Sequence, residues 1–230
     1  MQIQTAIRTA SLRHQPSARL PSGPLPRSRP NADVIEVMGT AMPFARDSEI
    51  YGENEPAEYL YKVISGTVRT YKVLVDGRRQ IGAFHVPGDV FGFETGEKHT
   101  LSAEAITECK IAVIKRTALM AIAERDNEVA RYMLTLTTRE LQRAQAHMLL
   151  LVKSAQERVA TFLLEMAERV STPGTVELSM SRQDIADYLG LTIETVSRTL
   201  GRLEKTDTIE VSSSRRIVLR DHSALSRLNS

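Results

Sequence analysis

The stretch "SRQDIADYLGLTIETVSRTLGRLEK", Ser181 to Lys205, carries the most specific pattern in the chain. Ser181 with Asp184 three residues later is typical of a helix start, because the two side chains can bond backbone N–H groups of the first turn. Gly190 predicts a tight turn, and Thr192 predicts the cap of a second helix. The residues expected to face inward are Ile185, Ala186, Leu189, Leu191, Val196, Leu200 and Leu203. Together these signals predict a helix-turn-helix.

The second helix of such a unit places its first turns in the major groove of DNA. The residues expected to contact bases there are Ile193, Glu194, Ser197 and Arg198. Arg198 can bond both acceptors of guanine, Glu194 can accept from N4 of cytosine, and Ile193 can contact a thymine methyl. The residues expected to contact the DNA backbone are Thr192, Arg202, Arg215 and Arg216. The alternative is a solvated helix face on which Glu194 and Arg198, four residues apart, form a salt bridge.

The segments around this unit predict a winged helix-turn-helix domain over residues 156–230. A helix is expected at about 156–170, "QERVATFLLEMAERV", ending at the sequence Ser171-Thr172-Pro173-Gly174. A compact module follows: the segment "TVELSM", two helices, and then "TIEV" with "RRIVLRD" as a hairpin that would form the wing.

A long helix is predicted over about 127–153, after a short one at 117–125. Leu134, Leu141, Met148 and Ala155 recur every seven residues, with Thr137, Ala144 and Leu151 between them. A seven-residue repeat implies a partner helix wound left-handedly around the first. We therefore expect residues 126–155 to form a dimerisation helix, and the chain to form a homodimer. The expected interface residues are Leu134, Leu141, Ala144, Met148 and Leu151. The alternative is a helix packed on its own β domain.

Residues 33–125 predict a β domain. Short apolar runs are separated by the turn signals Ser65-Gly66, Asp76-Gly77 and Pro87-Gly88-Asp89. Asp76-Gly77 is a hairpin signal, because both residue types accept positive φ. Turns at roughly ten-residue spacing favour a jelly roll or β-roll. The predicted fold class is α+β: an N-terminal β-roll, a long dimerisation helix and a C-terminal winged helix-turn-helix.

Composition limits the cellular setting and the partners. The net charge of +2 is too small to indicate a polyanion partner by itself. A single cysteine, Cys109, excludes an internal disulfide and an all-cysteine metal site, and fits a reducing compartment. No apolar run approaches the roughly 20 residues that span a bilayer, so we expect a cytoplasmic protein. Residues 1–32 hold five arginines, five of the nine prolines and no acid, which predicts a disordered basic tail.

The predicted order of domains resembles the CRP/FNR family of bacterial transcription regulators, over about residues 33–225. "SGTVRTYKVLVDGRRQIGAFHVPGDVFG" is similar to the β-roll signature of that family, and the helix-turn-helix stretch is similar to its recognition motif. Within the family, "LTIETVSR" is closer to the FNR and FixK branches, which are known for reading TTGAT…ATCAA palindromes. The resemblance implies that Arg198 and Glu194 contact the G·C pair and that Ser197 and Ile193 contact neighbouring thymines.

The resemblance also directs attention to "PGDVFGFETGEKHTLSA", residues 87–103. Cyclic-AMP receptors of the family hold the cyclic phosphate there with an arginine followed by serine or threonine. Here His99, Thr100 and Leu101 stand in that neighbourhood. An unpaired phosphate would be repelled by the acidic residues Glu94, Glu97 and Glu104. The cysteines of the oxygen sensors, and the cysteine and histidine of the carbon-monoxide sensors, are absent as well.

These absences favour the FixK branch, whose members typically lack a sensory ligand and act downstream of an oxygen-responsive phosphorelay. The sequence thus predicts an activator of genes for microaerobic respiration or nitrogen fixation, with DNA, a second copy and RNA polymerase as partners, and with no cofactor or metal. One alternative is an effector-gated regulator that binds a nucleotide, or haem through His85 or His99. Another is an enzyme, but the candidate acid/base residues Asp89, Glu94, Glu97 and His99 show no nucleophile–base spacing and no metal-ligand set. We expect Cys109 to be a buried, inert thiol.

Overall fold

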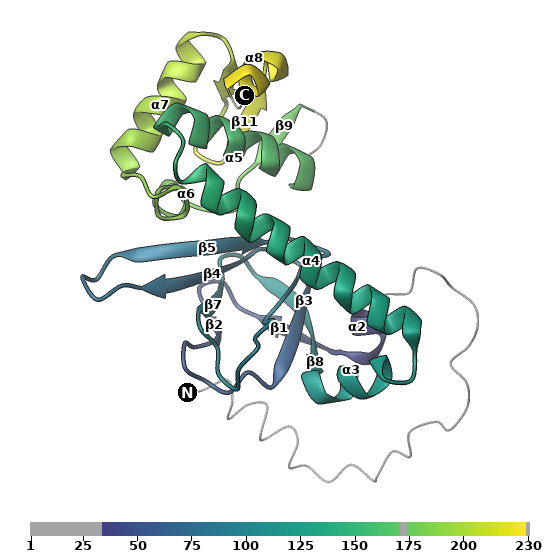
Figure 1. Cartoon of the computed structure of the whole chain (residues 1–230). Coiled ribbons are helices and arrows are strands. Elements are labelled where there is room, and N and C mark those ends of the chain that lie inside the picture. Colours follow the sequence, from purple (N-terminus) through teal and green to yellow (C-terminus); the bar gives the residue numbers. More distant parts are fainter. Residues whose placement is uncertain (1–33, 171–173, 229–230) are drawn as a thin grey trace.

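The long helix α4 (Asn127–Leu150) runs from a β domain to a smaller helical domain (Figure 1). The structure, a computed structural model, describes residues 34–170 and 174–228. The predicted basic tail at 1–32 and most of the predicted helix stop at 171–174 lie outside these residues. The observed architecture confirms the α+β class and the predicted order of β-roll, long helix and helix-turn-helix.

Two antiparallel sheets pack face to face in the β domain. The first has the order β1-β8-β3-β6, formed by Thr40–Phe44, Cys109–Lys115, Tyr59–Ser65 and Val90–Phe91. The second has the order β2-β7-β4-β5, formed by Glu49–Tyr51, Ser102–Ala105, Val68–Val73 and Arg79–His85. Apolar side chains from both sheets meet in one core, among them Phe44, Tyr61, Val68, Phe91, Ala103 and Ile111. Burial of this shared face is what stabilises the β-roll.

The predicted turns shape the edges of the sheets. The β4–β5 hairpin confirms the Asp76-Gly77 signal, although only Gly77 takes a positive φ (82°), because the loop is longer than a two-residue turn. Leu74 N–H donates to Arg78 O across this loop at 2.7 Å. Gly66 is more constrained: its φ is 87°, and a Cβ added there would lie 2.4 Å from the backbone oxygen of Glu108. Only glycine meets both conditions at this position.

Three helices cover one end of the β domain: α2 (Val34–Met38), α3 (Arg116–Ala123) and the first half of α4. Val129 and Leu136 of α4 are buried against Leu119 of α3 and Val90 of the β domain. Other apolar residues of α4 point away from this contact. Leu134, Leu141 and Met148 are 67%, 57% and 63% exposed. The helix therefore packs on its own β domain with one face and leaves a second apolar face open.

Helix α4 ends at Leu150, three residues earlier than predicted. Arg158 donates to the carbonyl oxygens of Leu151 (2.6 Å) and Lys153 (2.8 Å), which satisfies groups that a continued helix would have bonded. Ser154 N–H then donates to the Glu157 carboxylate (2.7 Å) at the start of α5 (Ala155–Val170). The Ser-x-x-Glu spacing was a readable capping signal. Leu151 accordingly lies beyond the helix and is half-buried.

The C-terminal domain surrounds a separate core. Its further elements are β9 (Thr175–Glu177), α6 (Arg182–Leu189), α7 (Ile193–Lys205), β10 (Ile209–Val211), β11 (Arg216–Leu219) and α8 (His222–Leu228). The sheet order is β10-β11-β9, which confirms the predicted wing hairpin. Helix α8, which covers α5, was not predicted. Over the described residues, none of the helices has the length and apolarity needed to cross a bilayer.

Candidate nucleic-acid interface

The helix-turn-helix is built by the local signals read from the sequence. Ser181 Oγ accepts the Asp184 N–H (3.1 Å), and the Asp184 carboxylate accepts the Ser181 N–H (2.9 Å), so the capping box is complete. Gly190 ends α6 in the left-handed conformation, with φ 61°. Thr192 Oγ1 accepts the Thr195 N–H (3.2 Å) and caps α7. The predicted turn and both helix starts are confirmed.

Helix α7 separates a buried face from an exposed one. Val196, Leu200 and Leu203 are buried in the core of the domain, as predicted, and Leu191 packs against that core while partly exposed. The side chains that the sequence assigned to DNA share the exposed face: Thr192, Ile193, Glu194, Ser197, Arg198 and Arg202. A helix presented in this way can enter a major groove without losing its internal packing.

The polar groups of this face have the charge that base recognition needs. Hydrogen bonds from its own backbone N–H and from the Thr192 hydroxyl hold the pKa of Glu194 below its usual value. The carboxylate is therefore an acceptor at neutral pH, as contact with cytosine N4 requires. Arg198 Nη2 donates to Thr195 Oγ1 at 3.3 Å, a weak bond that leaves its remaining donors free for a base.

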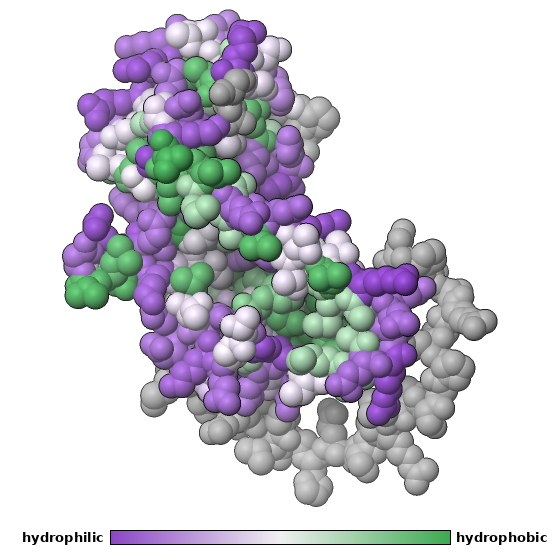
Figure 2. All heavy atoms as spheres, viewed as in Figure 1, coloured by the Kyte–Doolittle hydropathy of each residue, from purple (hydrophilic) through white to green (hydrophobic). Residues whose placement is uncertain are grey.

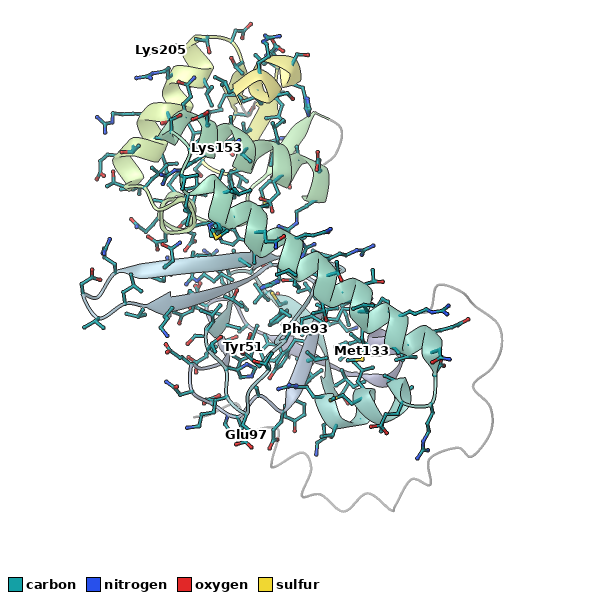
Figure 3. All side chains as sticks on the ribbon, viewed as in Figure 1. Tyr51, Phe93, Glu97, Met133, Lys153 and Lys205 are labelled. Atoms are coloured by element: carbon teal, nitrogen blue, oxygen red, sulfur yellow. The ribbon has the colours of Figure 1, made fainter. Side chains whose placement is uncertain are left out.

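The wing adds two cations beside α7. Arg215 lies in the β10–β11 loop and Arg216 opens β11, and both side chains are exposed. Ser213 Oγ accepts the N–H groups of both residues, at 3.3 and 3.0 Å, and so fixes the loop. Strand β10 packs against α7. Figure 3 shows Lys205 at the far end of α7, pointing into solvent. Exposed cations in these positions suit phosphate oxygens.

Sequence reasoning missed Arg158, which fixes the turn of the helix-turn-helix. Its Nη1 donates to Leu189 O (2.8 Å) at the end of α6, while its Nη2 donates to Leu151 O beyond α4. One guanidinium thus joins the end of the long helix to the DNA-binding unit. Only the neighbouring Ser154–Glu157 cap marked this region in the sequence.

Asp184 also has a second role that the capping pattern did not indicate. Its Oδ1 accepts from Arg69 of β4 (2.7 Å) and from Arg79 of β5 (2.6 Å). Burial alone would raise the pKa of Asp184, but the Ser181 backbone N–H and hydroxyl and the two guanidiniums hold it below its usual value. Glu104 accepts from Arg69 as well (2.8 Å). The sequence did not indicate this ion pair of Glu104, and the repulsion of a phosphate stays a prediction.

Residues 87–103 form side-chain and backbone contacts with the helices α3, α4 and α5. Asp89 is buried and pairs with Arg143 of α4 (2.7 Å) and with Arg169 of α5 (2.6 Å). Although burial opposes ionisation, these guanidiniums and the Val86 N–H keep the pKa of Asp89 below its usual value. Arg116 reaches the same stretch from α3, and its guanidinium donates to backbone oxygens, including that of Gly96 (3.2 Å).

Aromatic rings fill the interior of the β domain beside this stretch. His99 stacks on Tyr51 with ring centroids 3.6 Å apart, and Tyr51 contacts Tyr61 at 5.2 Å. Tyr61 stacks on Phe91 at 5.2 Å, and Phe91 stacks on His85 at 4.8 Å. Figure 3 shows Tyr51 within the domain. Both histidines are parts of a packed core. Among the described residues no cluster of three or more His, Cys, Asp or Glu side chains could hold a metal ion.

Two protein-family models match the two ends of this architecture. Residues 157–228 match the model of the Crp-like helix-turn-helix domain, and residues 41–126 match that of the cyclic nucleotide-binding domain. The nitrogen fixation regulation protein FixK of Azorhizobium caulinodans is 55% identical over 205 residues, which cover 86% of this chain and 83% of that protein. The chain belongs to the CRP/FNR family. Among the relatives of this CRP/FNR protein, FixK of Rhizobium meliloti is 41% identical over 207 residues, 90% of this chain and 91% of the relative.

A solved structure agrees with the fold of this CRP/FNR protein. The structure of FixK2 from Bradyrhizobium japonicum has 52% sequence identity and a TM-score of 0.81, and the match covers 84% of this chain and 98% of that one. The chain is thus a FixK-type transcription regulator with a DNA-binding helix-turn-helix, as the resemblance implied. Its relatives are regulators of transcription and not enzymes.

Proposed function

We propose that this regulator is a homodimeric activator that binds a TTGAT…ATCAA palindrome without a small-molecule effector. The observation that carries the proposal is the exposed face of α7, where Ile193, Glu194, Ser197 and Arg198 lie on successive turns above a buried face. Arg198 would donate to guanine and Glu194 would accept from the paired cytosine, while Ser197 and Ile193 contact thymines. Target genes for nitrogen fixation follow from the names of the FixK relatives. Target genes for microaerobic respiration follow from the family resemblance alone, and activity in the cytoplasm follows from the proposed DNA target.

The open face of α4 supports the homodimer. Leu134, Leu141 and Met148 repeat every seven residues and are more than half exposed, and Ala144 is exposed between them. Figure 2 shows hydrophobic side chains gathered over α4. A second copy of α4 would cover them and place the two recognition helices in successive major grooves, about 34 Å apart. Leu151 would contribute only at the edge of this contact, because it lies beyond the helix.

The filled β domain supports effector-free activity. The ring stack from His85 to His99 occupies the interior, and Phe93 with Met133 belongs to the apolar cluster between residues 87–103 and α4 (Figure 3). Asp89 already bonds both helices that lead to the DNA-binding unit. We infer from these pairs that the β domain holds both helices through its own side chains, without a bound ligand.

Activation requires a contact with RNA polymerase, and the tip of the β4–β5 hairpin is the surface we propose for it. Val73, Leu74 and Val75 are exposed there, and Figure 2 shows them as an isolated hydrophobic projection. An exposed apolar patch is more often a protein contact site than polar surface is.

Substitution of Arg198 tests the base contacts. We expect Arg198→Ala to cost about 1–3 kcal/mol of affinity for the palindrome and to relax discrimination at the guanine. The matched control is Arg202→Ala, which should weaken binding to all sequences alike, because a phosphate contact carries no base information. Fluorescence anisotropy with TTGAT and guanine-substituted duplexes measures both effects. An Arg198→Ala protein that still rejects the substituted site as strongly as wild type would refute the assignment.

A second function, gating by an effector, has one observation in its favour. A hollow of about 630 Å³ lies beside residues 96–98, and Lys98, Lys115 and Arg116 line it together with Glu58 and Glu97. Calorimetry with cyclic nucleotides, and the absorbance spectrum of purified protein for haem, test this alternative. Full DNA affinity in effector-free protein counts against it.

A further inference from the structure

Two strands of the β domain hold the first helix of the DNA-binding unit through ion pairs. Arg79 Nη2 lies 2.6 Å from Asp184 Oδ1, and Arg79 also lies 2.7 Å from Asp187 Oδ2, three residues further along α6. Arg69 Nη1 lies 2.7 Å from Asp184 Oδ1. These four residues, Arg69, Arg79, Asp184 and Asp187, form a clamp between parts of the chain more than 100 residues apart.

The clamp is largely withdrawn from solvent. The side chains of Asp184 and Asp187 are 6% and 12% exposed, and those of Arg69 and Arg79 are 12% and 24% exposed. Ion pairs held this far from water are screened little by salt, and removal of one partner leaves a buried charge without compensation. Both guanidinium carbons also lie 5.8 Å from the ring centre of Tyr71, which restricts their rotation.

Apolar and polar contacts extend the clamp along the same strands. Phe84 of β5 contacts the ring of Tyr188 in α6 at 5.2 Å between centroids, and Ile81 of β5 belongs to the core of the C-terminal domain. Thr67 Oγ1 donates to Ser179 Oγ at 3.0 Å just before α6. Figure 1 shows the β4–β5 hairpin lying beneath the helix-turn-helix. The β domain is thus docked on α6, the helix that carries α7.

The clamp adds to the contacts of Arg158 at the link between α4 and α5, which is short and irregular. Residues 151–154 separate the two helices, and rotation there would swing α7 relative to α4. In a dimer joined along α4, the distance between the two recognition helices depends on this angle. A palindrome with a fixed spacer is read only when both helices reach their grooves together.

We infer that Arg69 and Arg79 are positioning residues for DNA recognition, which hold the helix-turn-helix at the angle that matches the half-site spacing of the palindrome. They touch no DNA and act through Asp184 and Asp187 of α6. The inference rests on the proposed function, since it concerns a dimer on a palindrome. It predicts that the clamp controls tolerance to spacer length, a property that the base contacts of α7 do not set.

The test compares Arg79→Ala with Arg78→Ala in the full-length protein. Arg78 is the neighbouring residue and its side chain is 77% exposed. Within the described residues its ion pair is with Asp76 of the same hairpin. Both variants remove one arginine, so they change the net charge equally. Anisotropy titrations use TTGAT…ATCAA duplexes with the spacer preferred by wild type, with that spacer one base pair shorter or longer, and with a single half-site.

We expect Arg79→Ala to bind the preferred duplex about tenfold more weakly than Arg78→Ala does, a typical coupling between sites. Its preference for the correct spacer should shrink, while its affinity for the single half-site stays unchanged. Equal affinity and an equal spacer profile in the two variants would overturn the inference.

A conservative variant separates positioning from general damage. If Arg79→Ala melts at a lower temperature, Arg79→Lys keeps a cation opposite both Asp184 and Asp187. Recovery of the spacer preference in Arg79→Lys supports the inference, and a folded Arg79→Lys protein with the spacer profile of Arg79→Ala contradicts it. Failure of the proposed function looks different, because wild type itself would then not distinguish the palindrome from a base-swapped duplex.

Discussion

Leu141 lies at the middle of the open face of α4, and its truncation should weaken the dimer strongly. Leu141→Ala removes three carbons, worth about 0.8 kcal/mol each when fully buried. Because the side chain is 57% exposed in the protomer, a partner helix would bury a little over half of that value, about 1.4 kcal/mol. Two copies meet in a dimer, so the total loss is about 3 kcal/mol, or a dimer dissociation constant about 100-fold higher.

Sedimentation velocity over a series of protein concentrations measures this change directly. Alanine is a better helix former than leucine, so α4 itself should not be weakened. The control is Met120→Ala on α3, which removes a similar apolar side chain that is 55% exposed and lies off the repeat. A Leu141→Ala protein with the wild-type dissociation constant would refute the assignment of this face to the dimer.

Two further predictions concern stability. Burial lowers the pKa of His85 from 6.5 to about 4. As the pH falls from 6.5 to 4, His85 is therefore protonated in the unfolded chain while it stays neutral in the native protein. The unfolding free energy should drop by up to about 3 kcal/mol over that range, measured by urea denaturation. His85→Gln should flatten this slope, and a His85→Gln protein that keeps the wild-type slope would contradict the buried neutral imidazole. Gly66→Ala should cost about 2–3 kcal/mol more than Gly77→Ala, because both have positive φ but only at Gly66 would a Cβ meet other atoms within 3 Å. Matching thermal denaturation curves for the two alanine variants would rule out the clash.

The parts of the site that depend on neighbouring residues were predictable from the sequence. Ser181, Asp184 and Gly190 act on the backbone within a turn of their own position, so their types and spacing contain the signal. The inward and outward faces of α7 follow equally from helix geometry. For the same reason the β4–β5 hairpin was readable at Asp76-Gly77.

The parts that depend on distant residues were not predictable. Arg69 and Arg79 look like ordinary strand residues, and only folding brings them to Asp184, more than 100 residues away. The helix was predicted to continue past Leu150 because the seven-residue repeat continues there. The repeat contains no information on the hydrogen bonds from Arg158 to the carbonyl oxygens that follow Leu150. Glu104 was read as a free charge for a similar reason, since its partner Arg69 lies on a neighbouring strand.

An electrophoretic mobility shift with purified, effector-free protein tests the central claim most directly. The duplexes are a TTGAT…ATCAA palindrome and the same duplex with the G·C pairs of both half-sites exchanged. We predict a dimer-sized complex on the palindrome, unchanged by added cyclic nucleotide or haem, and much weaker binding to the exchanged duplex. Equal binding to the two duplexes, or binding to the palindrome only after a small molecule is added, would contradict the account.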